Sequence, residues 1–390
     1  MRPRAWCDAA MDERPSVAIF FDEVEDPRVE RTRRHKLSDI LLIVLIGTIC
    51  ECKGWDALHR FAEDSDEYLE SLLELPHGVP SADTIRRVMS ALDPVGFRNA
   101  FIAWAGRLCE STADKQVAID GKTVRGAFAG ADGQGALHLI NAWVCENQMV
   151  LGQYATDVKS NEITAIPGLI ALLNLRGAVV TIDAIGCQKS IAGALVEKGA
   201  DYIFGLKGNQ PTLHQEVLSA FDASTCERLR CDENNFDETT DKGHGRLEVR
   251  RVSVLREVAW LTRSEQWPGL RSLVLVESER TVRGETSCER RAYISSLDAP
   301  AVRMSALVRN HWHIENKLHW VLDATFGEDH ARVGRRNGAE NLAAVRKIAI
   351  NLLKNAPVKR PGESLAAKRR RANRRLDQLL AVLRAGTTGN

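Results

Sequence analysis

The 390-residue sequence has no cysteine pair at metal-binding spacing, almost no net charge and few aromatic residues. Its nine cysteines include no CxxC pair, so neither a zinc knuckle nor a disulfide framework is expected, and the thiols are predicted to stay reduced. A net charge of +1 gives no global sign of a nucleic-acid partner. Length and composition favour a globular protein of two or three domains.

The chain also lacks a long hydrophobic run. The most apolar stretch, ILLIVLIGTIC at 40–50, is far shorter than the ~20 residues that a membrane helix needs, so it is predicted to be a buried helix. The N-terminus, MRPRAWCDAAMDER, has no apolar core of a signal peptide. We therefore expect a cytoplasmic protein with no membrane partner.

Charge is balanced overall but unevenly distributed. Basic residues gather in RVERTRRHK at 28–36 and again after 357, whereas 61–75 is acidic and helix-like. Basic ends on a balanced body are typical of a protein that contacts a polyanion locally, although an ordinary solvated surface is the favoured explanation for 28–36 alone.

Hydrophobic periodicity divides the chain into six segments. Three successive strands, followed by helix, strand, helix and strand, predict a mixed α/β sheet flanked by helices. A later stretch alternates charged and apolar residues, which predicts antiparallel strands with one wet face. The segments are 1–27 (little pattern), 28–112 (all-helical N-terminal domain), 113–212 (first part of the α/β core), 213–299 (β-rich insertion), 300–356 (second, helical part of the core) and 357–390 (basic tail).

Two aspartates are predicted to end apolar strands. Asp120 follows QVAI, and Asp183 follows GAVVTI. Carboxylates at the ends of neighbouring buried strands meet at the sheet edge where open α/β sheets bind ligands, although a turn or helix cap explains either one alone. Mg²⁺ prefers such oxygen ligands, and two metal ions can drive phosphodiester transfer. The pair predicts a metal site that needs a third carboxylate.

The stretch RNHWHIENKLHW at 309–320 offers that carboxylate, or a different metal site. His311, Glu315 and His319 share one face of a helix, which suggests zinc, but the spacing does not match HExxH. The alternative makes Glu315 the third acid. Trp312 and Trp320 are interpreted as packing residues rather than as platforms for an extruded base.

Six motifs occur in an order that carries a resemblance. They are DGKTVRGA (120–127), KSNEITAIP (159–167), TIDAIGCQ (181–188), YIFGLKGNQPTL (202–213), HGRLEVRRV (244–252) and HWHIENKLHWVLDATFGED (311–329). Across roughly residues 20–355 the chain resembles the ISAs-type, H-repeat-associated branch of the insertion-sequence DDE transposases.

The resemblance implies a ribonuclease-H-like core interrupted by the insertion, with the family's triad at Asp120, Asp183 and Glu315. It implies Mg²⁺, with Mn²⁺ as a substitute, and hydrolysis and transesterification of double-stranded DNA at transposon ends and target. A homo-oligomer in the DNA complex and a bacterial cytoplasmic, nucleoid-associated location are expected with it. The competing class is a decayed relative that binds DNA without cutting it.

The last motif departs from the wider superfamily, which places Tyr, Arg, Glu and Lys at Y-x2-R-x3-E-x6-K. This chain has Val308, His311, Glu315 and Leu322 there, so only the glutamate is retained. Turns and wet strand faces explain the remaining polar residues as well as DNA does. The candidate DNA contacts are Lys122, Arg125, Lys159, Gln188, Lys207, Asn209, His244, Arg246, His311 and Lys317.

Overall fold

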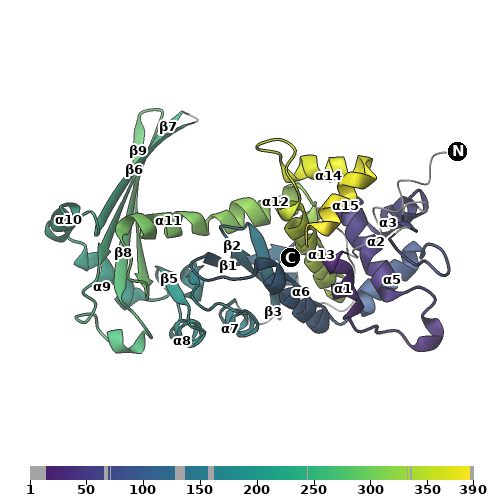
Figure 1. Cartoon of the computed structure of the whole chain (residues 1–390). Helices are drawn as coiled ribbons and strands as arrows, with labels where there is room; N and C mark the ends of the chain where they lie inside the picture. The colour runs from purple at the N-terminus through teal and green to yellow at the C-terminus, as the bar shows by residue number, and fades with distance from the viewer. Residues whose placement is uncertain are drawn as a thin grey trace.

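A single nine-stranded mixed sheet runs through the molecule (Figure 1). The computed structural model describes residues 15–65, 69–70, 72–127, 137–156, 162–243, 245–331, 333 and 336–386. The strands are β1 (Gln116–Val124), β2 (Leu137–Val144), β3 (Met149–Thr156), β4 (Val179–Ile182), β5 (Asp201–Leu206), β6 (Phe236–Gly243), β7 (Arg246–Leu255), β8 (Ser272–Val282) and β9 (Glu285–Ser295). The prediction of a mixed α/β fold is confirmed.

The strand order is β3-β2-β1-β4-β5-β9-β8-β7-β6. β1, β4 and β5 are parallel, whereas β2 and β3 extend the sheet antiparallel on one side and β9 pairs antiparallel with β5 on the other. The predicted β-rich insertion therefore does not form a separate sheet, because its four strands continue the central one. It also begins with helices rather than strands, α9 (Pro211–Ala220) and α10 (Ala223–Arg230).

Helices make up the regular structure of the described residues before β1. They are α1 (Ser16–Asp22), the 3₁₀ helix Glu30–Thr32, α2 (Leu37–Ile49), α3 (Trp55–Glu63), α5 (Ala82–Ala91) and α6 (Pro94–Cys109). Every residue of α2 is buried, as its continuous apolar sequence predicts. No helix within the described residues has the length and apolar character needed to cross a bilayer.

The remaining helices follow β3 in the chain. They are α7 (Glu162–Leu172), the 3₁₀ helix Ala184–Gly186, α8 (Lys189–Glu197), the 3₁₀ helix Ser264–Gln266, α11 (Ala301–His311), the π-helix Ile314–His319, α12 (Trp320–Ala324), the 3₁₀ helix Glu328–His330, α13 (Arg336–Asn355), α14 (Leu365–Arg374) and α15 (Leu376–Arg384). Figure 1 shows α11 and α12 running across the sheet from the outer strands towards α13.

The N-terminal helices share one core with the C-terminal ones. Side chains from α1, α2, α5 and α6 pack with those of α13, α14 and α15 and with one face of β1, β2 and β3. α7 and α8 cover the opposite face, and α11 covers β4, β5, β7 and β8. The boundary predicted at 112 between a helical domain and the core stays a prediction.

α13 also pairs with the sheet through polar side chains. Asn351 is fully buried, and it accepts from the backbone N–H of Val150 and donates to that residue's carbonyl, both at 2.8 Å. β3 is an edge strand, so this amide replaces the partner strand that Val150 lacks.

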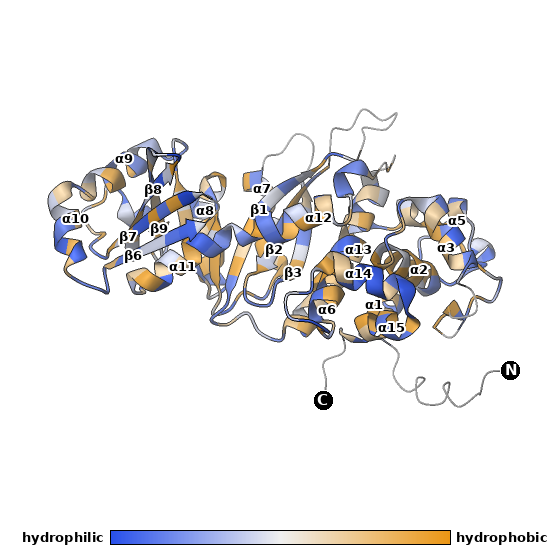
Figure 2. Cartoon of the chain, turned by 90° about the horizontal axis from the view of Figure 1, so that it is seen from above, coloured by the Kyte–Doolittle hydropathy of each residue, from blue (hydrophilic) through white to orange (hydrophobic). Residues whose placement is uncertain are grey.

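The predicted basic tail is folded. α14 is strongly hydrophilic (Figure 2), yet Lys368 and Arg369 are buried. Lys368 donates to the carbonyls of Leu353 and Ala356, and Arg369 donates to that of Thr48. Both cations lie at helix C-termini, where the last carbonyls lack helical partners, so they stabilise helix ends rather than meet solvent.

Candidate active site

Asp120 and Asp183 lie side by side at the end of the parallel strand pair. The ladder between β1 and β4 stops at Ile119 and Ile182, and each aspartate is the next residue along its strand. The sequence predicts both aspartates at this carboxyl edge of the sheet. The expectation that β1 ends at Asp120 is wrong, however, because β2 pairs with β1 as far as Val124.

Asp183 also caps the 3₁₀ helix that follows it. Its Oδ1 accepts from the backbone N–H of Ile185 at 3.0 Å. Burial, followed by the neighbouring carboxylate of Glu162, nevertheless raises the pKa of Asp183, while the backbone hydrogen bonds and Lys207 oppose the rise. The capping hydrogen bond therefore does not offset the effect of burial and of Glu162 on the pKa of Asp183.

Asp120 is the most perturbed acid of the cluster. Burial, followed by the charge of Asp183, raises the pKa of Asp120 to about 8, and Glu162 and Glu315 add to the rise. Asp183 directly after β4, Glu162 on α7 and Glu315 on the π-helix therefore all lie within electrostatic range of Asp120. Such mutual repulsion is typical of functional sites rather than of structural ion pairs.

Glu315 lies on a π-helix instead of the predicted α-helix. The segment Ile314–His319 packs against β1, and the glutamate itself is exposed. The preceding helix is pinned to the sheet, because Nδ1 of His311 lies 3.0 Å from Oγ1 of Thr181 on β4. π-helices occur mostly as short insertions in α-helices, frequently at functional sites.

The two histidines that flank Glu315 have different neighbours. Burial lowers the pKa of His311 to about 4, so its ring is neutral and cannot replace an arginine as a DNA-binding cation. His319 Nδ1 lies 3.6 Å from Oδ2 of Asp120, and burial, followed by the charge of Lys122, lowers the pKa of His319 to about 3. The described residues contain no three-ligand group made of His311, Glu315 and His319, so a zinc site there is not supported.

The acid cluster is chemically suited to divalent cations. Among the described residues, no three His, Cys, Asp or Glu side chains stand close enough to hold a metal ion without rearrangement. The donors are carboxylate oxygens, which hard cations prefer, and a bound cation would offset the repulsion that raises the pKa of Asp120. Asp120, Asp183 and Glu315 therefore fit such an ion in donor type and charge.

Glu162 and His138 contact each other beside this cluster, and no role was predicted for either. His138 on β2 lies with Nε2 2.7 Å from Oε1 of Glu162 at the start of α7. Glu162 lies in the motif KSNEITAIP, in which Lys159 is the one predicted site residue. The proximity of Glu162 to Asp120 arises from the folding of β2 and α7, which local patterns do not report.

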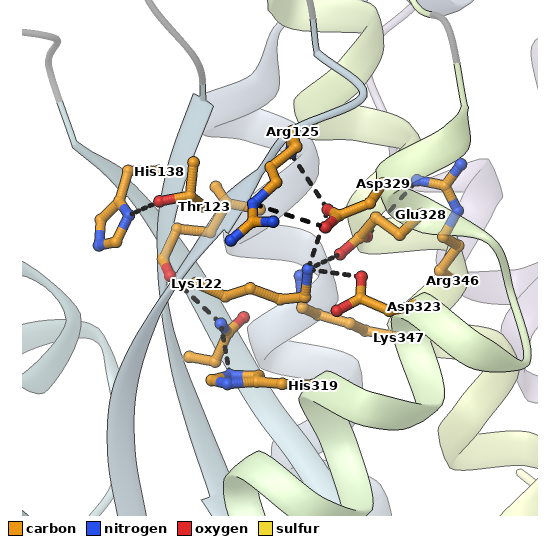
Figure 3. Close-up of polar contacts among 12 residues, drawn as sticks. Lys122, Thr123, Arg125, His138, His319, Asp323, Glu328, Asp329, Arg346 and Lys347 are labelled. Carbon is orange, nitrogen blue, oxygen red and sulfur yellow. Dashed lines mark hydrogen bonds and ion pairs between the residues drawn. The ribbon is translucent and has the colours of Figure 1, made fainter.

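Lys122 is buried rather than exposed on a turn. Figure 3 shows its ammonium directed at three acids that follow Glu315 in the chain. Nζ lies 2.7 Å from Asp323, 3.3 Å from Asp329 and 3.5 Å from Glu328. Burial alone would lower the pKa of Lys122, but Glu328, Asp323 and Asp329 outweigh it and raise that pKa. Because its charge is already paired, Lys122 holds the structure together instead of offering a free DNA contact.

Three other candidate DNA contacts lie near one or the other group of acids, and a fourth, Gln188, lies at the start of α8. Arg125 is 82% exposed at its side chain and lies 3.9 Å from Asp329. Lys207 is exposed and within electrostatic range of Asp183, and Asn209 donates to the carbonyl of Ala184 at 2.5 Å. Gln188 is half-buried at the start of α8.

The remaining candidates are scattered. Arg246 lies at the tip of β7, 3.8 Å from Glu248, and Lys317 contacts His313 at 3.4 Å. Lys159 and His244 lie outside the described residues.

The two tryptophans of the Glu315 segment are exposed, contrary to the packing interpretation. Trp320 is 62% exposed and Trp312 40% exposed, with the Arg291 guanidinium 5.2 Å from the Trp312 ring. Their indoles are therefore surface groups on either side of the π-helix that carries Glu315.

Family models match nearly the whole chain. Residues 111–352, which include the four acids, match the model described as a transposase DDE domain, and residues 18–105 match the DDE_Tnp_1-associated model. The chain belongs to the DDE transposase family.

Individual relatives agree with this assignment. The "H repeat-associated putative transposase YhhI" of Escherichia coli strain K12 is 39% identical over 374 residues, covering 94% of this chain and 96% of its own. A protein encoded in the dhlA 3′ region of Xanthobacter autotrophicus is 44% identical over 73% of this chain and 96% of its own. The predicted resemblance to H-repeat-associated transposases is confirmed. A piggyBac transposase in a synaptic complex with hairpin DNA aligns at 11% identity with a TM-score of 0.44, covering 97% of this chain and 82% of that one, which is too weak a likeness to bear on the fold.

Proposed function

We propose that this DDE transposase cleaves the ends of an insertion sequence and transfers the freed DNA strands to a target. The observation that carries the proposal is the acid cluster. Asp120 and Asp183 follow the last parallel pair of β1 and β4, and Glu315 lies within electrostatic range of Asp120. Carboxylates in this arrangement suit a two-metal site for phosphodiester chemistry.

In this proposal Asp120, Asp183 and Glu315 hold Mg²⁺, with Mn²⁺ as a substitute. The ions would supply a metal-activated nucleophile and stabilise the leaving oxygen. The strand order β3-β2-β1-β4-β5, with two antiparallel strands beside three parallel ones, supports a ribonuclease-H-like core. Burial of Asp120 keeps bulk water from screening its charge.

Double-stranded DNA is the proposed partner, as transposon ends and as target, with a homo-oligomer forming in the DNA complex. Among the described candidate cations, those that remain for phosphate contacts include Arg125, Lys207 and Lys317, because Lys122 is paired and burial lowers the pKa of His311. Affinity carried by such contacts falls as salt rises. The proposed location is the bacterial cytoplasm, with nucleoid association when DNA is bound.

The test is a cleavage assay with the inverted repeats that flank the gene. Wild-type protein with Mg²⁺ should nick a labelled duplex carrying these ends and join them to a plasmid. Asp120→Asn should abolish both reactions and still shift the DNA in a gel, whereas Glu197→Gln, an exposed acid on α8, should cleave normally. Full cleavage by Asp120→Asn would reject the assignment. DNA binding without nicking by the wild type would favour the decayed, DNA-binding relative.

A further inference from the structure

A chain of three side chains crosses from β1 to α7 beside Asp120. Thr123 on β1 lies opposite His138 on β2, and its Oγ1 is 2.9 Å from Nδ1 of that ring. The other ring nitrogen, Nε2, is 2.7 Å from Oε1 of Glu162. The imidazole therefore has both nitrogens engaged, which fixes its orientation and that of the carboxylate.

Gly121 makes room for this pair next to the acid cluster. It follows Asp120 directly, and a Cβ at this position would collide with Oε1 of Glu162 and lie 2.6 Å from Nε2 of His138. The histidine and the glutamate thus pack on the bare backbone of the residue beside Asp120. Any other residue type here would push Glu162 away from the cluster.

The charge of Glu162 acts on both strand-end aspartates. After burial, Glu162 is the largest cause of the raised pKa of Asp183, and it also contributes at Asp120. An acid placed this close to two others is unfavourable without a compensating cation. His138, its hydrogen-bond partner, is the residue that holds it there despite the repulsion.

We propose that Glu162 is a fourth carboxylate of the metal-binding cluster, and that His138, held by Thr123, is the residue that positions it. The proposal rests on the proposed function for the presence of the metal ions, and it adds two residues to the expected triad. One oxygen of Glu162 is engaged by His138, which leaves the other to meet a divalent cation or a water bound to it.

A simpler role for Glu162 is that of an acid in the first turn of α7, where it would favour the helix dipole. That role requires neither the histidine nor the space over Gly121. It also predicts no dependence of metal binding on Glu162, so the two roles are separable by measurement.

The experiment is calorimetric titration of Mn²⁺ into the full-length, metal-free protein without DNA. Glu162→Gln retains a side chain that can hydrogen-bond to His138 and removes the charge, so Mn²⁺ should bind about 10- to 100-fold more weakly. His138→Asn leaves the carboxylate but releases it, and should weaken binding by about 10-fold. Glu197→Gln, which removes an exposed charge from α8, should leave the affinity unchanged.

Asp120→Asn separates failure of this inference from failure of the proposed function. If Asp120→Asn loses Mn²⁺ binding while Glu162→Gln binds like the wild type, Glu162 is not part of the cluster and the function stands. If neither the wild type nor any variant binds Mn²⁺, the metal-dependent function fails with it. Thermal melting of each variant without metal checks that it is folded. If Glu162→Gln melts at a lower temperature than the wild type, the test depends on His138→Asn. Normal Mn²⁺ affinity in His138→Asn would overturn the positioning role.

Discussion

Replacing Lys122 by methionine should strongly destabilise the protein. The ammonium has three carboxylate neighbours within 3.5 Å, and its side chain is only 7% exposed. Methionine preserves the length and the apolar contacts of the stem, so the change removes chiefly the charge. Glu328 would then be left fully buried, with Arg346 at 3.4 Å as its remaining ion pair.

The expected loss is about 3–5 kcal/mol of unfolding free energy, the usual cost of leaving a buried charge without its partner. The contribution is fully present below the unfolded pKa of 10.5, because the folded pKa of Lys122 is raised, and it is lost only as pH rises through that higher value. Measurement at pH 7 therefore detects all of it.

Urea denaturation followed by circular dichroism provides the measurement, and Arg125→Met is the matched control. Arg125 is 82% exposed and lies 3.9 Å from Asp329, an acid it shares with Lys122, so its loss should cost at most about 0.5 kcal/mol. Equal stability of the two single variants would refute the buried-network argument.

Two further outcomes are expected. Asn351→Leu should lower the free energy of unfolding by about 2 kcal/mol or more, because both backbone groups of Val150 lose a buried partner, and it should speed hydrogen exchange at the Val150 amide. The same change at exposed Asn355 on α13 should lower it much less. Equal losses in the two variants would contradict the role of Asn351 at the edge strand. Iodoacetamide at pH 8 should modify the exposed thiols of the native protein and spare the thiols whose pKa burial raises to about 12. Peptide mass spectrometry identifies the labelled cysteines. Early labelling of the buried cysteines would show that they are accessible. Among the cysteines that the structure describes, the exposed thiols are Cys231 and Cys288, and the spared ones are Cys50, Cys145 and Cys187.

The sheet and its two aspartates were predictable because their signals are local. A buried parallel strand is a short apolar run, and the residue that follows it lies at the carboxyl edge whatever the rest of the chain does. The parallel pairing of β1 and β4 therefore brings Asp120 and Asp183 together as expected. The triad as a catalytic set stays a prediction.

The features that local patterns missed depend on distant partners. Lys122 looked like a turn cation because its acids lie about two hundred residues later, and a lone lysine gives no sign of them. Glu162 gives no local sign of its neighbours for the same reason, because His138 lies 24 residues earlier in the chain. Lys368 and Arg369 look solvent-exposed in a basic run, and only the packed helix ends explain their burial.

The prediction that Trp312 and Trp320 are packing residues was wrong for a different reason. Large apolar residues are usually buried, but the face on which they lie depends on helical register, and the π-helix changes that register between them. Sequence periodicity assumes a constant ~3.6 residues per turn, so it cannot assign faces across this segment.

The stretch from 311 to 323 is intolerant of any change in length, because Glu315 and Asp323 both lie in it and depend on its helical register. An α-helix turns about 100° per residue, so losing one residue here would rotate everything that follows by that amount. Glu315 could stay beside Asp120 only if Asp323 left Lys122, or the reverse. A one-codon deletion in this stretch would therefore uncouple the acid cluster from the buried ion pairs beside it.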